Sequence, residues 1–157
     1  MISIKKLKIG ILFLLIIFIL VGLPQNAKAD SSLYIPKWLI ESELLPNGDL
    51  HIEEDITFDF SGDFNGVYRE IVLDKTNGAK YIDVSEIVNG KEVKYNKIFD
   101  GKNGDTNAYE ILGGLNRKKI KIFSPSEDEK KTFRLSYTVK NVAIKYNDSG
   151  ELYYQFL

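Results

Sequence analysis

Two charged residues, Glu54 and Arg69, stand at positions where the surrounding pattern predicts apolar side chains. In LHIEEDITFDF, residues 50–60, the alternate row that starts at Leu50 is apolar except for Glu54. In the segment after the SGDFNG sequence, the row that contains Val67 and Ile71 is apolar except for Arg69. A carboxylate or a guanidinium that is buried without a partner costs several kcal/mol. We therefore expect each of the two charges to be paired.

The two charges are opposite and could satisfy each other. The planar fork of Arg can hold a carboxylate through two hydrogen bonds. In a regular hairpin around the SGDFNG sequence, Glu54 and Arg69 would not face each other, so a bulge, a flared loop or placement on two facing sheets is needed. Our hypothesis is that Glu54 and Arg69 form a buried structural pair. The alternative is that Arg69 points into a ligand cleft and binds an anionic group.

Acidic side chains near Glu54 could suggest a calcium site or the two carboxylates of a glycosidase, which lie about 5–10 Å apart across a cleft. The residues concerned are Glu53, Glu54, Asp55, Asp59 and Asp63. Period two places Glu53, Asp55 and Asp59 on the polar face of a strand, and we interpret them as a solvated surface. The DGKNGD sequence at 100–105 resembles a calcium loop, but Lys102 occupies the place of an oxygen ligand. We expect no catalytic residue, no metal site and no cofactor.

The elements that position these residues are strands, because no segment of the chain outside its first 29 residues has a helical period. Hydrophobic runs with period two alternate with Gly-, Asn- and Asp-rich turns, and the Asn-Gly pairs are typical of tight hairpins. We expect an all-β, antiparallel, immunoglobulin-like β-sandwich of about nine or ten strands. The expected strands are Trp38–Leu45, Leu50–Phe60, Val67–Leu73, Tyr81–Val88, Val93–Ile98, Tyr109–Leu112, Lys119–Phe123, Lys131–Val139, Val142–Tyr146 and Glu151–Phe156.

The first 29 residues have the pattern of a secretory signal peptide. Three lysines precede 15 residues, Ile9 to Leu23, that are apolar apart from two glycines, and Ala27-Lys28-Ala29 matches a signal peptidase site. As a helix this run spans about 22 Å, against roughly 30 Å of hydrocarbon in a bilayer. We predict a signal-peptide helix over 1–29 and cleavage between Ala29 and Asp30; the alternative is an uncleaved anchor.

Residues 30–157 are long enough for one domain with a single core. The composition of this part of the chain excludes several classes of function. The predicted leader holds four of the 21 basic residues and none of the 22 acidic ones, which leaves a net charge of −5. This balance argues against nucleic acid as a partner. The chain has no Cys and one His, which excludes disulfides, thiolate metal sites and sites that need two imidazoles.

The order of motifs resembles the bacterial family called domain of unknown function 2207, which occurs in predicted membrane proteins. The motifs are a strand that carries Glu, Phe and Phe at alternate positions, then G-x-F-x-G-x-Y-R-x-I, and near the end Y-x-V-x-N-x-x-x-x-Y-x-D-x-x-E-L-Y. The matching residues are Gly48, Glu54, Phe58, Phe60, Gly62, Phe64, Gly66, Tyr68, Arg69, Ile71, Tyr137, Asn141, Tyr146, Asp148, Glu151, Leu152 and Tyr153. The resemblance implies that full-length relatives continue into C-terminal transmembrane helices, through which they associate with the membrane, and it implies no established activity.

We therefore expect an exported, non-enzymatic domain, on the outer face of the cell membrane or secreted, that interacts with an unknown protein or cell-envelope partner or has a structural role there. The alternative is a secreted carbohydrate-active protein, either a binding module or a hydrolase. Because the sequence stops inside the apolar ELYYQFL run, we also expect a fragment truncated at its C-terminus, although the final strand could simply end there.

Overall fold

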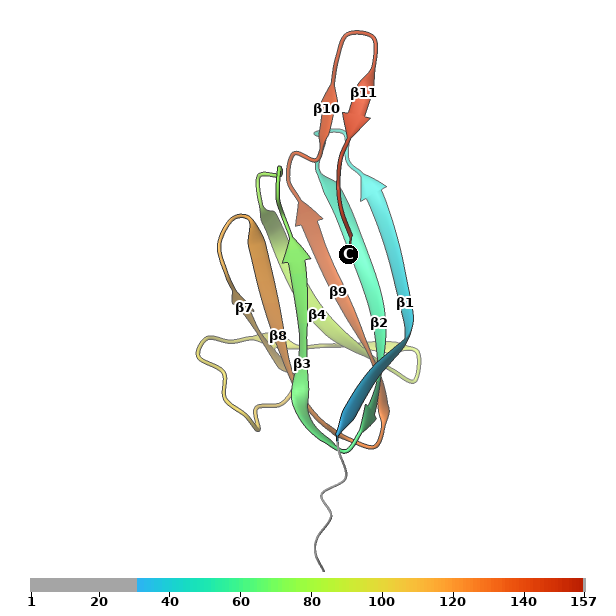
Figure 1. The fold of residues 1–157 in the computed structure, drawn as a ribbon, viewed down its shortest axis with the longest axis vertical. Coiled ribbons are helices and arrows are strands. Elements are labelled where there is room, and N and C mark those ends of the chain that lie inside the picture. Colours follow the sequence, from blue (N-terminus) through green and yellow to red (C-terminus); the bar gives the residue numbers. More distant parts are fainter. Residues whose placement is uncertain (1–30, 157) are drawn as a thin grey trace, which may run out of the picture.

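The computed structural model describes residues 31–156, and the predicted signal peptide with its cleavage point between Ala29 and Asp30 lies outside these residues. The described part is all-β (Figure 1). Its strands are β1 (Ser32–Leu44), β2 (Leu50–Ser61), β3 (Asp63–Val72), β4 (Ala79–Val88), β5 (Lys91–Lys94), β6 (Asn96–Lys97), β7 (Ala108–Leu112), β8 (Arg117–Glu127), β9 (Lys130–Val139), β10 (Ala143–Lys145) and β11 (Gly150–Leu152).

The strands form a β-sandwich of two sheets, as the sequence predicted. One sheet has the order β1-β2-β9-β4-β5, and the other has the order β3-β8-β7-β6. Neighbouring strands are antiparallel except for β6 and β7, which are parallel. The β10–β11 hairpin is a separate two-stranded sheet that projects beyond one end of the sandwich (Figure 1).

Alternation along the strands builds the core. In β2 every second residue from Leu50 to Phe60 is buried, and the residues between them are only partly covered. The row meets Phe133, Leu135 and Tyr137 of β9, which are fully buried. Ile71 of β3, together with Ile120 and Ile122 of β8, closes the core from the facing sheet.

The connection between β2 and β3 passes from one sheet to the other. β2 pairs with β1 and β9, whereas β3 pairs with β8 alone. The sequence placed a loop at SGDFNG and a strand start at Val67, but β3 begins at Asp63. The strand can start this early because a bulge between Phe64 and Gly66 absorbs the irregular Gly-containing sequence.

The C-terminal segment differs from the expected strand over residues 151–156. Strand β11 ends at Leu152, and residues 153–156 then run back along the sandwich between β3 and the β1–β2 hairpin (Figure 1). Tyr154 and Phe156 pack against the core there instead of continuing the β-ladder. No helix within residues 31–156 has the length and apolarity needed to cross a membrane.

Candidate functional site

Glu54 lies in β2, the second strand of the larger sheet, between β1 and β9. Its neighbours across the two ladders are Ile40 of β1 and Leu135 of β9. The diagonal neighbours are Trp38 and Tyr137, because their direct partners are two residues from Glu54 on either side. Diagonal positions are within reach of aromatic side chains. The register therefore offers Glu54 one indole N–H and one phenol O–H.

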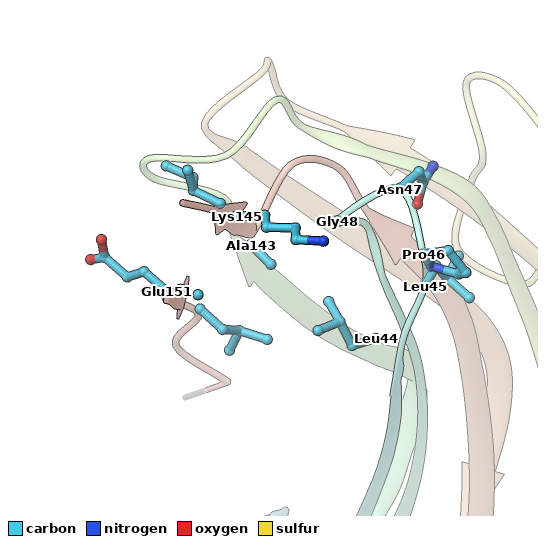
Figure 2. Close-up of a pocket in the computed structure, with 11 residues that line it drawn as sticks. Leu44, Leu45, Pro46, Asn47, Gly48, Ala143, Lys145 and Glu151 are labelled. Carbon is cyan, nitrogen blue, oxygen red and sulfur yellow. The ribbon is translucent and has the colours of Figure 1, made fainter. Parts of the chain in front are cut away.

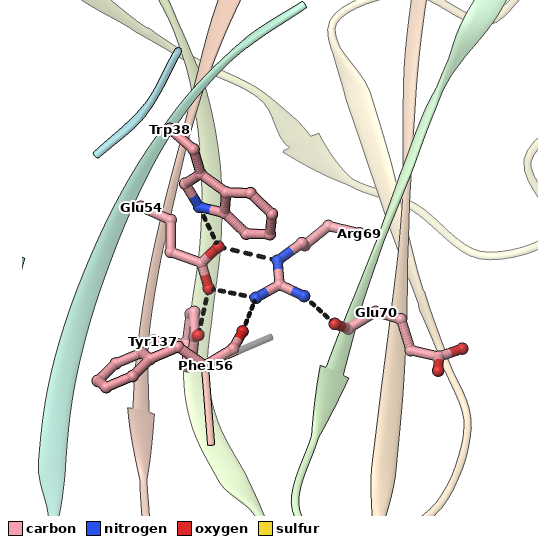
Figure 3. A network of polar contacts seen from close by, with 6 residues as sticks. All are labelled: Trp38, Glu54, Arg69, Glu70, Tyr137 and Phe156. Carbon is pink, nitrogen blue, oxygen red and sulfur yellow. Dashed lines mark hydrogen bonds and ion pairs between the residues drawn. The ribbon is translucent and has the colours of Figure 1, made fainter. Parts of the chain in front are cut away.

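The carboxylate of Glu54 accepts four hydrogen bonds and has 0% of its side chain exposed (Figure 3). Trp38 Nε1 donates to Oε2 at 3.0 Å, and the hydroxyl of Tyr137 donates to Oε1. Arg69 donates from Nε to Oε2 at 2.8 Å and from Nη2 to Oε1 at 2.9 Å. This bidentate contact is the strong form of a carboxylate–guanidinium pair.

Arg69 reaches Glu54 from β3 in the facing sheet, so the pair joins the two layers of the sandwich (Figure 3). Its guanidinium carbon lies 4.7 Å from the centroid of the Trp38 ring. Nη2 also donates to the carbonyl oxygen of Phe156 at 2.9 Å, and Nη1 donates to the carbonyl of Glu70. Each of the three guanidinium nitrogens thus has an acceptor, and the side chain is 12% exposed.

The protonation of the nearby tyrosines fits this arrangement. Burial, followed by the negative charge of Glu54, raises the pKa of Tyr137, which keeps its hydroxyl protonated and able to donate. Burial also raises the pKa of Tyr154. Within residues 31–156, every buried side-chain nitrogen or oxygen has a hydrogen-bond partner. The network is therefore internally satisfied and presents no unpaired acid or base to a substrate.

A second ion pair holds the turn between β1 and β2 against β4. Asp49 Oδ2 accepts from Lys80 Nζ at 2.7 Å and from Asn47 Nδ2 at 3.0 Å, while Oδ1 accepts from the backbone N–H of Asn141 at 3.0 Å. The hydrogen bond from Lys80 is the main reason that the pKa of Asp49 is lowered, and the same bond raises the pKa of Lys80.

Of the other acidic candidates, Glu53, Asp55 and Asp59 lie on the outer face of the larger sheet, and Asp63 begins β3 in the smaller sheet. Asp55 accepts two hydrogen bonds from Arg134, at 2.7 and 2.8 Å, and Asp59 pairs with Lys130 at 2.8 Å. Glu53 is within 4.0 Å of Arg134, and Asp63 is exposed. No group of three or more acidic or His side chains in the described part of the chain is placed to hold a metal ion.

An open cleft of about 630 Å³ lies at the end of the sandwich, beneath the β10–β11 hairpin (Figure 2). One wall is the β1–β2 turn, residues 44–48, and the other is the hairpin. Leu44, Ile144 and Leu152 contribute half-exposed apolar side chains to it. The cleft holds no constellation of acid, base and nucleophile.

The structure brings Glu54 and Arg69 together by placement on facing sheets, one of the three routes that the sequence left open. It also adds partners that sequence reasoning missed. Trp38 and Tyr137 could have been found from the register, had the pairing of β1, β2 and β9 been known. The Phe156 contact is made by a backbone carbonyl, so no residue type signals it.

Comparison with known proteins shows a family and a similar solved structure. The family model described as "Predicted membrane protein (DUF2207) N-terminal domain" matches residues 34–157. Among solved structures, the backbone protein of pilus 2b from group B streptococcus is similar, with 13% identity and a TM-score of 0.42. The match covers 73% of this chain and 54% of the pilus protein. No curated protein matches.

Proposed function

Because the chain belongs to the family of N-terminal domains of predicted membrane proteins known as domain of unknown function 2207, we propose that it is a non-enzymatic, extracytoplasmic interaction or structural domain at the cell surface. Its partner is another protein or a component of the cell envelope. The predicted signal peptide over residues 1–29 supports the extracytoplasmic placement.

One observation argues for an interaction or structural role over catalysis. The most deeply buried charge, Glu54, has its carboxylate occupied by four donors from the domain itself, and these come from three strands. Catalytic acids and bases need a reacting group within hydrogen-bond reach. A carboxylate that is saturated by internal donors instead fixes the relative position of the two sheets, which suits a rigid module.

The proposed extracytoplasmic placement of the domain is tested with bacterial spheroplasts that produce the 157-residue chain. A protease added from outside should degrade the domain, while a cytoplasmic marker protein stays intact. Deletion of residues 2–29 is the matched control, and this variant should be protected until the cells are broken. Protection of the unaltered chain in intact spheroplasts would contradict the proposal.

A second candidate function, binding of an acidic glycan, is favoured by the conformation of Tyr81. This residue lies in β4 at a bulge between Lys80 and Asp83, with φ +55° and 74% of its surface exposed. Positive φ is a genuine outlier for a bulky residue and costs about 1–3 kcal/mol. The ring stands at a groove of about 460 Å³ to which Lys80, Lys97 and Lys118 contribute. An aromatic platform beside cations is suited to a sugar that carries carboxylates.

Strand β5 pairs only with residues 85–88 of β4. The same bulge, with Lys80, also protects residues 79–83 of β4 from pairing with another strand, and a binding experiment separates the two roles. The probe is a soluble polymer of uronic acid, with a neutral glucan as the comparison. Tyr81→Ala should abolish retention of the domain by the acidic polymer, and Tyr34→Ala, an exposed tyrosine on β1, should not. Equal retention of the two variants, or none by the unaltered domain, would reject the glycan reading.

A further inference from the structure

Strand β1 is an edge of the larger sheet. It stands first in the order β1-β2-β9-β4-β5 and, among the strands of residues 31–156, pairs with β2 alone (Figure 1). The ladder is regular over residues 37–44, whereas a bulge between Tyr34 and Lys37 interrupts it before that point. The edge of a sheet presents unpaired backbone N–H and C=O groups that can bind another strand. Residues 37–44 therefore offer a regular edge for a further strand.

The other edge of the same sheet is protected in a way that β1 is not. β5 has four residues, KEVK, and short, charged edge strands resist pairing with another chain. β1 has 13 residues, and Leu39 lies near its middle with 44% of its surface exposed. Leu39 lies opposite Asp55 of β2, on the outer face of the sheet. An exposed Leu on a long edge strand favours association.

The charged residues on either side of Leu39 have no opposite charge facing them in the ladder. Lys37 lies opposite Thr57 of β2, and Glu41 lies opposite Glu53, which carries the same charge. Both Lys37 and Glu41 are exposed, and neither forms an ion pair within the described part of the chain. Like charges directly opposite each other destabilise a strand pair. A strand added at this edge with a cation beside Glu41 and an anion beside Lys37 would supply the missing charges.

A second copy of β1 meets this requirement. If two copies run antiparallel about a two-fold axis at Leu39, residues equally far from Leu39 lie opposite each other. Lys37 of each copy then faces Glu41 of the other, and the two Leu39 side chains meet. On the inner face, Trp38 faces Ile40, and both are half-buried. An axis at Trp38 or at Ile40 would instead place Leu39 opposite a charged residue.

We propose that the domain forms a two-fold symmetric homodimer through β1, in which residues 37–41 of two copies pair antiparallel about Leu39. The two five-stranded sheets then join into one continuous sheet. Because the same surface is used by both copies, the contact closes on itself and association stops at the dimer. The paired segment is short, so the dimer is a weak one. This inference goes beyond the proposed function and does not depend on it.

Sedimentation velocity tests the association on residues 30–157, because the apolar core lies within residues 31–156. The protein should be monomeric at about 10 μM and dimeric at about 1 mM, as expected for a dissociation constant on the order of 100 μM. A monomer at every concentration up to about 1 mM would overturn the proposal and leave the edge to a strand of a different protein. Assembly beyond the dimer would overturn it as well.

Charge reversal tests the register. Lys37→Glu and Glu41→Lys each place like charges opposite each other in the dimer, and each should weaken self-association at least about tenfold. The double variant restores opposite charges and should dimerise like the unaltered domain, and a mixture of the two single variants should form a heterodimer. Lys91→Glu on β5 makes the same change of net charge and should have no effect. A double variant as weak as the single ones would overturn the register.

Cross-linking gives a second test of the register, since the chain has no Cys of its own. Leu39→Cys places the two thiols of a dimer at directly opposite positions, with Cα atoms about 5 Å apart. Glu43→Cys is the control, because its two thiols lie more than about 20 Å apart along the paired strands. A short bifunctional thiol reagent should therefore link Leu39→Cys into a covalent dimer and leave Glu43→Cys unlinked. Any other pattern would overturn the proposed axis.

Discussion

Glu54 and Asp55 are consecutive residues of β2, and they show how burial decides how much stability is lost when one partner of a salt bridge is removed. Each carboxylate is held by an Arg through two hydrogen bonds. Because successive side chains of a strand point to opposite faces, Glu54 enters the core and Asp55 faces outward. A buried pair that loses one partner leaves an uncompensated charge, whereas an outer pair leaves a charge that water can solvate.

We predict strong coupling between Glu54 and Arg69. Glu54→Gln or Arg69→Met should lower the free energy of unfolding by about 3–5 kcal/mol, because either change leaves buried polar groups unpaired. The double variant should lose much less than the sum of the two. Chemical denaturation of the four proteins measures the coupling energy. Losses that add would mean that the two residues do not act as a pair and would restore the ligand-cleft reading for Arg69.

The matched control for this cycle is the neighbouring outer pair. Asp55→Asn and Arg134→Met remove the same kinds of charge on the outer face of the larger sheet, where Asp55 of β2 pairs with Arg134 of β9. Their coupling should be about 1 kcal/mol or less, because the side chains are only partly covered, with Asp55 21% and Arg134 33% exposed. A coupling as large as that of Glu54 and Arg69 would contradict the argument from burial.

The Asp49–Lys80 pair predicts a specific acid sensitivity. The pKa of Asp49 is lower in the folded chain than its ordinary value of 3.8, so the pair contributes fully above that value and is lost as the pH falls through the lowered pKa. The denaturation midpoint of the unaltered domain should therefore fall below about pH 4. Asp49→Asn should be less stable at neutral pH and show a weaker dependence on acid. Identical pH profiles would count against this role of Asp49.

At the level of the elements, side-chain alternation predicted most strands but not how they pair. Alternation in β2 and β9 correctly marked Ile56, Phe133 and Tyr137 as core, because one face of each strand is buried. It could not show that β2 and β3 lie in different sheets, since that depends on long-range pairing. It also placed Tyr154 and Phe156 in a strand. Two aromatic side chains that pack on the core from alternate positions of an extended segment have the same spacing as side chains on one face of a strand.

The bulge in β3 depends on Gly66, and this can be tested. The residue has φ +142°, and a Cβ there would overlap the carbonyl oxygen of Ile122 on β8. Gly66→Ala should lower the free energy of unfolding by more than about 1 kcal/mol, since both the backbone conformation and the strand contact oppose a side chain. Gly114→Ala is the control, because nothing lies within 4 Å of the added Cβ. Equal stability of the two variants would contradict the prediction.

At the scale of the whole molecule, three buried tyrosines tie the interior together through their hydroxyl groups. Tyr95 donates to Glu86 at 2.7 Å, Tyr109 donates to the Ile82 carbonyl at 2.9 Å, and Tyr137 donates to Glu54. Tyr109 reaches across to β4 in the facing sheet, and Tyr137 belongs to the network that Arg69 enters from β3. The sandwich is therefore joined by polar contacts in addition to its apolar core.

These tyrosines predict alkaline unfolding of the domain as a unit. Burial raises the pKa of Tyr109 to about 12 and raises those of Tyr95 and Tyr137 further. Above pH 10, the ordinary tyrosine value, the unfolded chain releases protons that the folded chain retains, so stability is complete below that pH and falls as the pH rises. Part of the tyrosinate absorbance should then increase only as the β-sheet circular dichroism disappears. If all tyrosines ionise while that dichroism stays native, the hydroxyl contacts do not hold the interior as the structure indicates.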